Sequence, residues 1–381
     1  MEKIYKYSHI DWLLFLATIP LLLAGLITMR SFGAGSPPAG GDYFFSHQLI
    51  WIALGLIIFF LFSFIDWRFL RKSEFLMALF LLSIAILASL LIFGKVTRGA
   101  ASWFKLHFFS LEPADPVKII LILVLAKYFS RRHIEIAHAR HIIVSSFYVA
   151  IPAILVFFQP DFGSSIVLFL IWLGMIMVSG VSKGHLLLVF LIIALLFSAS
   201  WFFVFKPYQK ARIITFLHPL KDVRGAGYNA IQSMIAVGSG QVFGKGIGYG
   251  SQSRLGFLPE HQTDFIFSAF AEEWGLAGIS LLFLFYGIVV WRILKNAFLG
   301  ESNFETLFGV GLAIFLVAHF IIHVGMNIGL LPITGVGLPL VSYGGSNLLT
   351  AFAGLGILMG MRRYSRQAHR EDASAEFLSS E

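Results

Sequence analysis

The feature that most limits the fold of this 381-residue chain is a series of ten apolar stretches, each near the length needed to cross a bilayer. We place them near residues 12–29, 48–65, 75–94, 116–130, 142–158, 163–180, 185–205, 265–291, 306–328 and 345–361. Hydrophobic residues make up 58% of the chain and charged residues 13%, which excludes an ordinary soluble protein and a disordered one. The sequence therefore predicts an all-α polytopic membrane protein with about ten transmembrane helices.

Two of these stretches need comment. The first follows Lys3 and Lys6 without a small-residue cleavage site, so we expect a retained anchor rather than a signal peptide. The fourth is short, begins at Pro116 and contains Lys118, which predicts a half-buried or re-entrant helix. The chain has no cysteine, so disulfides, iron–sulfur clusters and cysteine-ligated zinc are excluded.

The distribution of charge predicts the orientation. The net charge is +8, which in a soluble protein would suggest a nucleic-acid partner, but cytoplasmic loops of membrane proteins are cationic for topological reasons. Lys and Arg concentrate on the side that holds both termini. We therefore expect cytoplasmic termini, no nucleic-acid partner, one membrane domain over 1–361, a large outer loop at 206–264 and a polar cytoplasmic tail at 362–381.

The outer loop carries charge that topology does not require. Its three acidic residues are Asp222, Glu260 and Asp264. Its seven basic residues are Lys206, Lys210, Arg212, Lys221, Arg224, Lys245 and Arg254. A basic surface at this interface favours either an anionic ligand, with phosphate the natural choice, or the anionic heads of membrane lipids. Charge alone does not separate these two interpretations.

The same loop contains a predicted helix and a glycine run. Residues 229–237 have the spacing of an amphipathic helix lying on the membrane surface. Six glycines then occur among the 13 residues from Gly238 to Gly250. Such a run either lets backbone N–H groups approach a ligand or simply makes a flexible loop, and the spacing is not that of a nucleotide-binding phosphate loop.

Asp264 stands where this polar loop meets the apolar run that follows. A carboxylate at that boundary is partly removed from water, which suits a general base acting on a hydroxyl. The simpler interpretation is that Thr263 or Asp264 caps the next helix, because aspartate is common at that position. The two roles are compatible.

Several ionisable groups fall inside or beside the apolar stretches, where they are costly unless paired. Lys118 either reaches a phosphate or snorkels to the interface, Asp161 lies in a short turn, and Glu272 and Glu273 need partners. One helix face carries His319, His323 and Asn327. Their spacing permits a metal, but an interhelical hydrogen-bond stripe is the favoured interpretation.

The motifs in this order resemble the SEDS family (shape, elongation, division and sporulation), with wording closer to its RodA branch than to its FtsW branch. The matching stretches are YQKARI at 208–213, GAGYNAIQS at 225–233, IAVGSG at 235–240, GKGIG at 244–248, QSRLGFLPE at 252–260, TDFIF at 263–267 and LPLVSYGGS at 338–346. The resemblance covers nearly the whole chain and agrees with ten spans and a large loop before the eighth.

The resemblance implies an inverting peptidoglycan glycosyltransferase of the bacterial inner membrane that serves cell elongation and shape. Such an enzyme polymerises lipid II into β-1,4-linked glycan, releases undecaprenyl pyrophosphate on the outer side, and works with a class B penicillin-binding protein. Asp264 matches the family's essential acidic residue and is the expected catalytic base. The expected substrate-binding residues are Lys118, Asp161, Arg212, Gln232, Ser239, Lys245, Arg254, Glu260, Thr263 and Ser342.

Some positions depart from the family pattern. Ser102 replaces an arginine, Glu112 and Asp115 stand where glutamine and glutamate are usual, Gln262 replaces a histidine, and His218 replaces an acidic residue. These changes leave Asp264 intact, but they remove the cation from position 102 and shorten the stem of the charge at 115. They suggest a divergent lineage.

Other roles stay open on the sequence alone. A divalent cation, Mg²⁺ or Mn²⁺, is compatible with a pyrophosphate substrate, but the sequence shows no dedicated metal site. A flippase or transporter for lipid II would also use intramembrane charges, although it should carry them on both leaflets. A scaffold for the penicillin-binding protein would leave the glycine run and Asp264 without a purpose.

Overall fold

The computed structural model describes residues 10–32, 40–93, 103–106, 109–130, 139–205, 207–222 and 227–379. Within these ranges, ten long helices coincide with the ten predicted stretches. They are α2 Trp12–Ser31, α3 Gly40–Phe64, α4 Ser73–Phe93, α5 Ala114–Ser130, α6 Ala139–Phe158, α7 Phe162–Val178, α8 Lys183–Phe203, α12 Ile266–Ala297, α13 Asn303–Asn327 and α14 Gly345–Ser379. Seven of them are long and apolar enough to cross a membrane. The all-α class is confirmed, whereas the number of ten spans remains a prediction.

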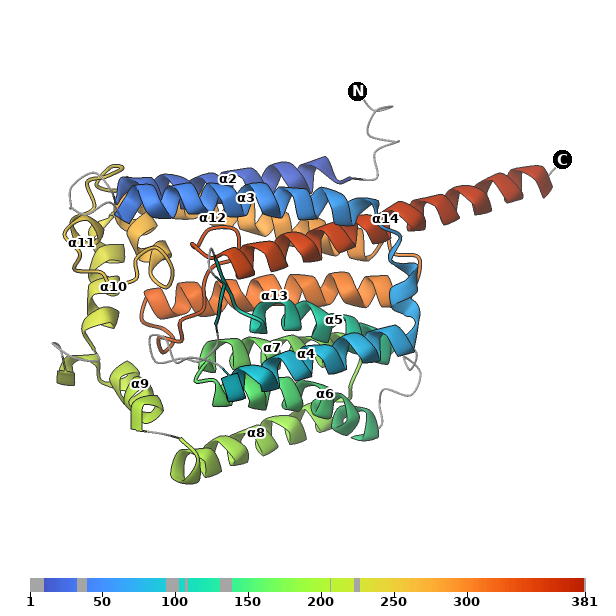
Figure 1. Cartoon of the computed structure of the whole chain (residues 1–381), viewed down its shortest axis with the longest axis horizontal. Coiled ribbons are helices and arrows are strands. Elements are labelled where there is room, and N and C mark those ends of the chain that lie inside the picture. The colour runs from blue at the N-terminus through green and yellow to red at the C-terminus, as the bar shows by residue number, and fades with distance from the viewer. Residues whose placement is uncertain are drawn as a thin grey trace.

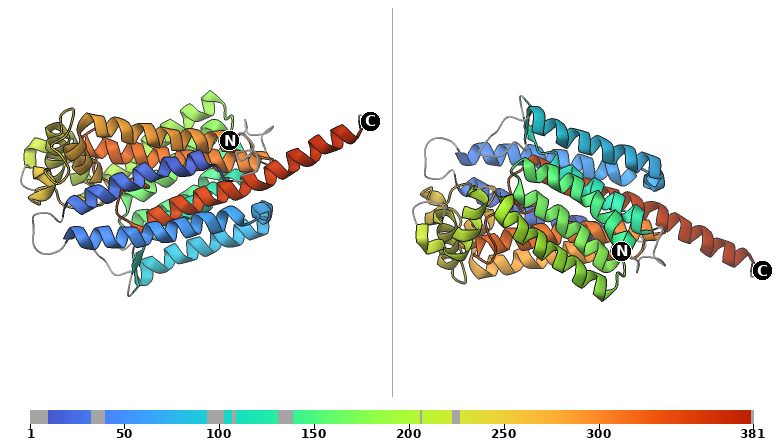
Figure 2. Two further views of the ribbon diagram at one scale, coloured as in Figure 1. Left: turned by 90° about the horizontal axis from the view of Figure 1, so that it is seen from above. Right: turned by 90° about the horizontal axis from the view of Figure 1, so that it is seen from below.

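The long helices form a bundle with two distinct ends (Figure 1). α2 begins and α14 leaves the bundle at one end, which we call the terminal end. The segment from α9 to α11 lies at the other, which we call the loop end. The predicted polar tail continues α14 as a helix that projects beyond the other helices in both views of Figure 2.

Helices α5 and α13 lie at the centre of the bundle. α5 contacts α4, α6, α7, α13 and α14, and α13 contacts α7, α12 and α14 as well. Most α5 side chains are buried, including that of Lys118. α5 is therefore enclosed by other helices, whereas its depth in the membrane, half-buried or re-entrant, remains a prediction.

The predicted outer loop contains short helices. They are α9 Pro207–Leu217, the 3₁₀ helix η2 Pro219–Asp222, α10 Tyr228–Ser239 and α11 Ser251–Arg254. α10 confirms the helix predicted over 229–237, although its position on a membrane surface stays a prediction. A second 3₁₀ helix, η1 Trp67–Arg71, joins α3 to α4. A hairpin of β1 Phe104–Leu106 and β2 Phe109–Leu111, which the sequence analysis missed, precedes α5.

α12 is broken near its start. Gly275 has φ of 63° and ψ of −166°, a conformation that a side chain would disfavour. The break separates a short buried segment, Ile266 to Trp274, from the long remainder of the helix. Asp264 therefore precedes a short helical piece rather than an uninterrupted span.

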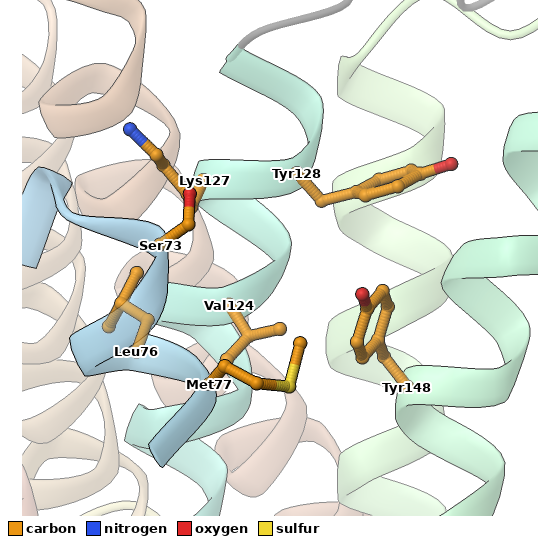
Figure 3. Close-up of a pocket in the computed structure, with 7 residues that line it drawn as sticks. All are labelled: Ser73, Leu76, Met77, Val124, Lys127, Tyr128 and Tyr148. Carbon is orange, nitrogen blue, oxygen red and sulfur yellow. The ribbon is translucent and has the colours of Figure 1, made fainter. Parts of the chain in front are cut away.

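A cavity of about 130 Å³ opens between α4, α5 and α6 (Figure 3). It is lined by Ser73, Leu76, Met77, Val124, Lys127, Tyr128 and Tyr148. In Figure 3 the ammonium group of Lys127 points away from the two tyrosines. The cavity includes none of the predicted site residues and lies toward the terminal end of α5, so we do not assign it to the candidate site.

Candidate active site

Asp264 is held by a tight turn that begins at Glu260. Glu260 has φ of 46°, in the left-handed region. Its carbonyl accepts hydrogen bonds from the backbone N–H groups of Thr263, Asp264 and Phe265, at 3.1, 3.1 and 3.3 Å. Its carboxylate also lies 3.5 Å from Oγ1 of Thr263. The backbone on the N-terminal side of Asp264 is therefore fixed before any substrate arrives.

Three successive carbonyls of this turn accept hydrogen bonds from distant parts of the chain. The backbone N–H of Tyr343 donates to Gln262 O at 2.9 Å, and Oγ of Ser342 donates to Thr263 O at 2.9 Å. The amide nitrogen of Asn327 donates to Asp264 O at 3.0 Å. These bonds tie the turn to α13 and to residues 328–344, which we call the cover loop.

The cover loop passes over Asp264. A Cβ added at Gly335 would lie 3.6 Å from Oδ2 of Asp264, so the carboxylate faces the backbone at this exposed glycine. Nδ1 of His319 lies 3.0 Å from Gly337 O, and Nδ1 of His323 lies 2.7 Å from Val336 O. The predicted interhelical hydrogen-bond stripe on α13 is confirmed only for Asn327, which bonds α12, whereas the two histidines hold this loop.

The predicted cap of α12 is wrong. The residue at the N-cap position is Phe265, which has no side-chain oxygen, and neither Thr263 nor Asp264 fills that role. The side-chain oxygen of Asn327 instead accepts from the backbone N–H of Ser268 at 3.2 Å and from the hydroxyl of Ser268 at 2.6 Å. Asp264 therefore does not serve as the helix cap, which is the role that the sequence alone favoured.

A charged cluster lies at the start of α5. Nζ of Lys118 donates to Oδ1 of Asp115 at 2.8 Å, and the Lys118 side chain is only 2% exposed. The carboxylates of Glu112 and Asp161 also lie close enough to act on its charge. Burial, reinforced by the charges of Asp115 and Asp161, raises the pKa of Glu112 well above its usual value despite the opposing charge of Lys118.

Asp161 connects this cluster to the cover loop. Its Oδ1 caps α7 by accepting from the N–H of Ser164 at 3.0 Å, so the predicted turn role is confirmed. Its Oδ2 is buried, and the described residues show no hydrogen-bond donor for it. Gly163, two residues later, packs against Thr334 and Val336 so closely that a side chain there would collide with them.

The cover loop also borders Arg212. A narrow gap is lined by Phe162, Phe205, Gln209, Arg212, Ile213, Pro332, Ile333 and Thr334. Arg212 lies on α9 and is exposed. The structure therefore gathers Asp161, Arg212 and Asp264 around one loop, with Lys118 buried beneath the same region.

Two other predicted site residues of the outer loop, Ser239 and Lys245, lie against a different carboxylate. Oε1 of Glu272, which is fully buried, accepts from Nζ of Lys245 at 2.8 Å and from Oγ of Ser251 at 3.1 Å. The backbone N–H of Gln252 binds the same group at 3.1 Å, and Oγ of Ser239 lies 3.5 Å away. Glu272 thus has the partners that its burial requires.

The glycine run packs on the broken helix. The N–H groups of Lys245 and Gly246 donate to the carbonyls of Glu272 and Glu273, each at 3.0 Å, and Gln241 O accepts from Leu276 N at 2.9 Å. A Cβ at Gly244 would lie 2.0 Å from Glu273 O. Gly240 and Gly244 are needed for this close backbone approach, whereas a Cβ built at Gly238 or Gly248 would meet nothing within 4 Å. The flexible-loop interpretation therefore does not fit Gly240 and Gly244, and the ligand-cradle interpretation remains a prediction.

Two predicted site residues of the outer loop lie outside the Asp264 turn. Gln232 is half-buried on α10, and Arg254 ends α11 with an exposed side chain, but neither lies among the contacts that hold Asp264. Ser102 lies outside the described residues.

Within the described ranges, no group of three or more His, Asp or Glu side chains is arranged to hold a metal ion. The part of the chain that the structure describes therefore offers no resident site for the divalent cation, and a metal brought by the substrate remains a prediction.

Comparison with known proteins bears directly on this arrangement. The sequence model of the "cell cycle protein" family of FtsW, RodA and SpoVE matches residues 11–367. The chain belongs to this family.

Curated relatives named after three kinds of family member match most of the chain. The peptidoglycan glycosyltransferase MrdB of Escherichia coli K12 is 36% identical over 288 residues, which cover 76% of this chain and 78% of MrdB. Stage V sporulation protein E of Bacillus subtilis is 33% identical over 373 residues, covering 95% and 99% of the two chains. The probable peptidoglycan glycosyltransferase FtsW of Wigglesworthia glossinidia brevipalpis is 33% identical over 372 residues, covering 94% of each.

Solved structures show the same fold. A chain of a peptidoglycan synthase complex that coordinates polymerisation and crosslinking superposes with a TM-score of 0.79 at 29% identity, covering 93% of this chain and 98% of that one. The rod shape determining protein RodA of Thermus thermophilus gives 0.68 at 27% identity, with 93% and 96% covered. This FtsW/RodA/SpoVE-family member is a multi-pass membrane protein.

Proposed function

We propose that this protein is a peptidoglycan glycosyltransferase that polymerises lipid II. The observation that carries the proposal is the position of Asp264, whose backbone is fixed by three separate elements and whose carboxylate faces the exposed Gly335. Membership of the family supports it, because relatives from two branches are named as peptidoglycan glycosyltransferases.

In the proposed reaction, the C4 hydroxyl of the acceptor GlcNAc attacks C1 of the donor MurNAc. Asp264 takes the hydroxyl proton as the new C–O bond forms, and undecaprenyl pyrophosphate leaves from the opposite face of the sugar. The α-linked donor therefore becomes a β-1,4 link by inversion. No step requires a metal ion held by the protein, so Mg²⁺ or Mn²⁺ would arrive with the pyrophosphate.

The pyrophosphate needs a cation at the protein surface. We assign this role to Arg212, which is exposed and borders the cover loop at Thr334. Lys118 is enclosed and paired with Asp115, so its role in this scheme is to neutralise the buried carboxylates beneath the site. Lys245 is likewise paired with Glu272.

The proposed setting follows from the charge distribution. The terminal end carries basic side chains such as Arg68, Arg71, Lys72, Arg292 and Lys295, which supports a cytoplasmic position for that end by the positive-inside rule. The loop end and Asp264 then face the outside of a bacterial inner membrane. A class B penicillin-binding protein is the proposed membrane partner, and the similarity to a chain of a synthase complex supports this.

The test is reconstitution of the purified full-length protein with lipid II in liposomes, with and without the partner. We expect glycan chains from the native protein, and none above background from Asp264→Ala. The matched control is Asp66→Ala, which removes an exposed carboxylate at the terminal end and should leave polymerisation unchanged.

The same experiment addresses the two rival functions. Movement of labelled lipid II between leaflets without glycan formation would indicate a flippase. If neither activity appears and Asp264→Asn still supports growth in cells, the chain acts as a scaffold, and the assignment of Asp264 is wrong.

A further inference from the structure

Asn327 joins three helices at the point where the Asp264 turn begins α12. It is the last residue of α13 and is fully buried. Its amide nitrogen donates to Asp264 O at 3.0 Å and to His323 O at 2.7 Å. Its backbone carbonyl accepts from Oγ of Ser233, on α10, at 2.8 Å. One side chain thus satisfies the end of its own helix and holds the residue proposed as the base.

The oxygen of the same amide replaces a missing helix cap. The third residue of a helix needs an acceptor for its backbone N–H, and a Ser, Thr, Asp or Asn at the N-cap position usually supplies it. Phe265 cannot, and Ser268 N bonds to Oδ1 of Asn327 instead. The hydroxyl of Ser268 donates to the same oxygen at 2.6 Å.

We propose that Asn327 is a positioning residue for Asp264, which supplies the cap of α12 from α13 and fixes the Asp264 carbonyl, so that the Asp264 carboxylate stays directed at the substrate side. This inference rests on the proposed function. An aspartate at the start of a helix would otherwise turn back to cap it, and its oxygens would be occupied by backbone N–H groups. The donor to the carbonyl and the acceptor for the helix belong to one rigid amide, so both constraints act on the same turn.

The molecule contains a matched asparagine at its terminal end. Asn296 is buried on α12, and its amide nitrogen donates to Oδ2 of Asp11 at 2.7 Å and to Arg292 O at 2.8 Å. Like Asn327, it bonds the carbonyl four residues earlier and one group on another segment. Its loss should disturb folding to a similar degree without touching the Asp264 turn.

The experiment compares Asn327→Ala, Asn327→Asp and Asn296→Ala in the full-length protein with its partner in liposomes. We expect Asn327→Ala to lower kcat for lipid II polymerisation about 100-fold with KM within about twofold, because a misplaced base slows the chemical step more than it weakens binding. We expect Asn296→Ala to lower the thermal unfolding midpoint while leaving kcat per folded molecule unchanged.

Asn327→Asp places a carboxyl group where two carbonyls face the amide nitrogen of Asn327. When ionised it keeps an acceptor for Ser268 but loses the donor to Asp264 O, so we expect both the thermal stability and kcat to stay low. An Asn327→Ala protein that is folded and retains native kcat would overturn the inference.

The assignment of Asn327 as the cap of α12 can be tested independently of the proposed function. If Asn327 rather than Asp264 caps α12, Asp264→Asn should lower the unfolding midpoint much less than Asn327→Ala does, whether or not polymerisation is measured. If the native protein makes no glycan, the proposed function fails, and the cap assignment is still decided by the midpoints of Asn327→Ala and Asp264→Asn. If Asp264→Asn is inactive but Asn327→Ala is not, the proposed function stands and the positioning inference fails.

Discussion

The two ends of the bundle differ in how their buried charged side chains are paired. At the terminal end, Oδ2 of Asp11 accepts from Nε and Nη2 of Arg292 at 2.9 and 2.5 Å and from Asn296 at 2.7 Å, and Arg362 lies 3.6 Å away. Toward the loop end, Lys118 faces the three carboxylates of Asp115, Glu112 and Asp161. The first cluster pairs one carboxylate with two cations, whereas the described residues of the second set one cation among three carboxyl groups.

A second pair of contacts supports this contrast. At the terminal end, Arg71 joins Glu301 at 2.7 Å and Glu305 at 2.8 Å, and the hydroxyl of Tyr364 donates to Glu305 at 2.9 Å. These bonds connect η1, α13 and α14. Ion pairs and hydrogen bonds therefore hold the helices together at the terminal end. Beneath Asp264, three carboxyl groups surround Lys118, and such crowding of ionisable groups is typical of functional sites.

The largest expected effect comes from exchanging one carboxylate for an amide at each end. Asp264→Asn should lower polymerisation about 10²- to 10⁴-fold, because the general base is lost. Its free energy of unfolding should change less than that of the exchange at the other end, as Asp264 does not cap α12. Steady-state rates on lipid II and thermal unfolding in detergent measure the two quantities.

Asp11→Asn should show the reverse. It removes the carboxylate from a buried ion pair and should lower the free energy of unfolding by ~3–5 kcal/mol, with rate per folded molecule unchanged. A large loss of stability in Asp264→Asn, or of turnover per folded molecule in Asp11→Asn, would show that the two ends do not divide structure and chemistry in this way.

The next prediction tests whether Lys118 stabilises the fold rather than binding the substrate. Lys118→Met leaves Asp115 without its cation and should lower the free energy of unfolding by ~3–5 kcal/mol. The double variant Lys118→Met/Asp115→Asn should recover part of that loss, because the buried charge is removed with its partner. Chemical denaturation of both variants measures it.

Lys127→Met on the same helix is the control and should change the free energy of unfolding by less than ~1 kcal/mol. A stable Lys118→Met protein that binds lipid II poorly would instead indicate that Lys118 contacts the pyrophosphate directly, as predicted from the sequence.

A smaller effect separates the two predicted phosphate ligands on the loop. Arg212→Gln should raise the KM for lipid II about tenfold, equivalent to ~1.4 kcal/mol, with little change in the unfolding midpoint. Lys245→Met should leave KM unchanged but lower the free energy of unfolding by ~2 kcal/mol, because it removes a charged hydrogen bond to buried Glu272. A raised KM with unchanged stability in Lys245→Met would instead indicate that Lys245 binds the substrate.

The smallest effects are opposite dependences on pH. The pKa of Glu112 is raised above 4.5, so the folded protein holds this proton more tightly than the unfolded chain and stability falls as pH rises above 4.5. Burial tends to raise the pKa of Asp11, but the bonds from Asn296 and Arg292 and the charge of Arg362 lower it below 3.8. Its stabilisation is therefore present above 3.8 and is lost as pH falls through the folded value.

Thermal unfolding midpoints across the acid and neutral range test this difference. Glu112→Gln should flatten the decline above pH 4.5, and Asp11→Asn should flatten the acid limb. Identical profiles for the native protein and Glu112→Gln would mean that the surplus charge beside Lys118 does not perturb Glu112.

Much of the architecture follows from the sequence. Apolar length identified all ten long helices, and helical spacing placed α10 and the face that carries His319, His323 and Asn327. These predictions succeed because apolar length and side-chain periodicity are local properties of the chain. The motif order also identified the family and singled out Asp264.

The tertiary structure alone decided which polar groups are structural. Asp264 satisfies every local rule for a helix cap, yet Asn327, 63 positions later in the chain, supplies the cap. Lys118 and Lys245 are basic residues in suitable places, but the fold pairs them with Asp115 and Glu272. A polar side chain binds whichever group the fold brings near, and that partner is set by packing between distant segments rather than by neighbouring sequence.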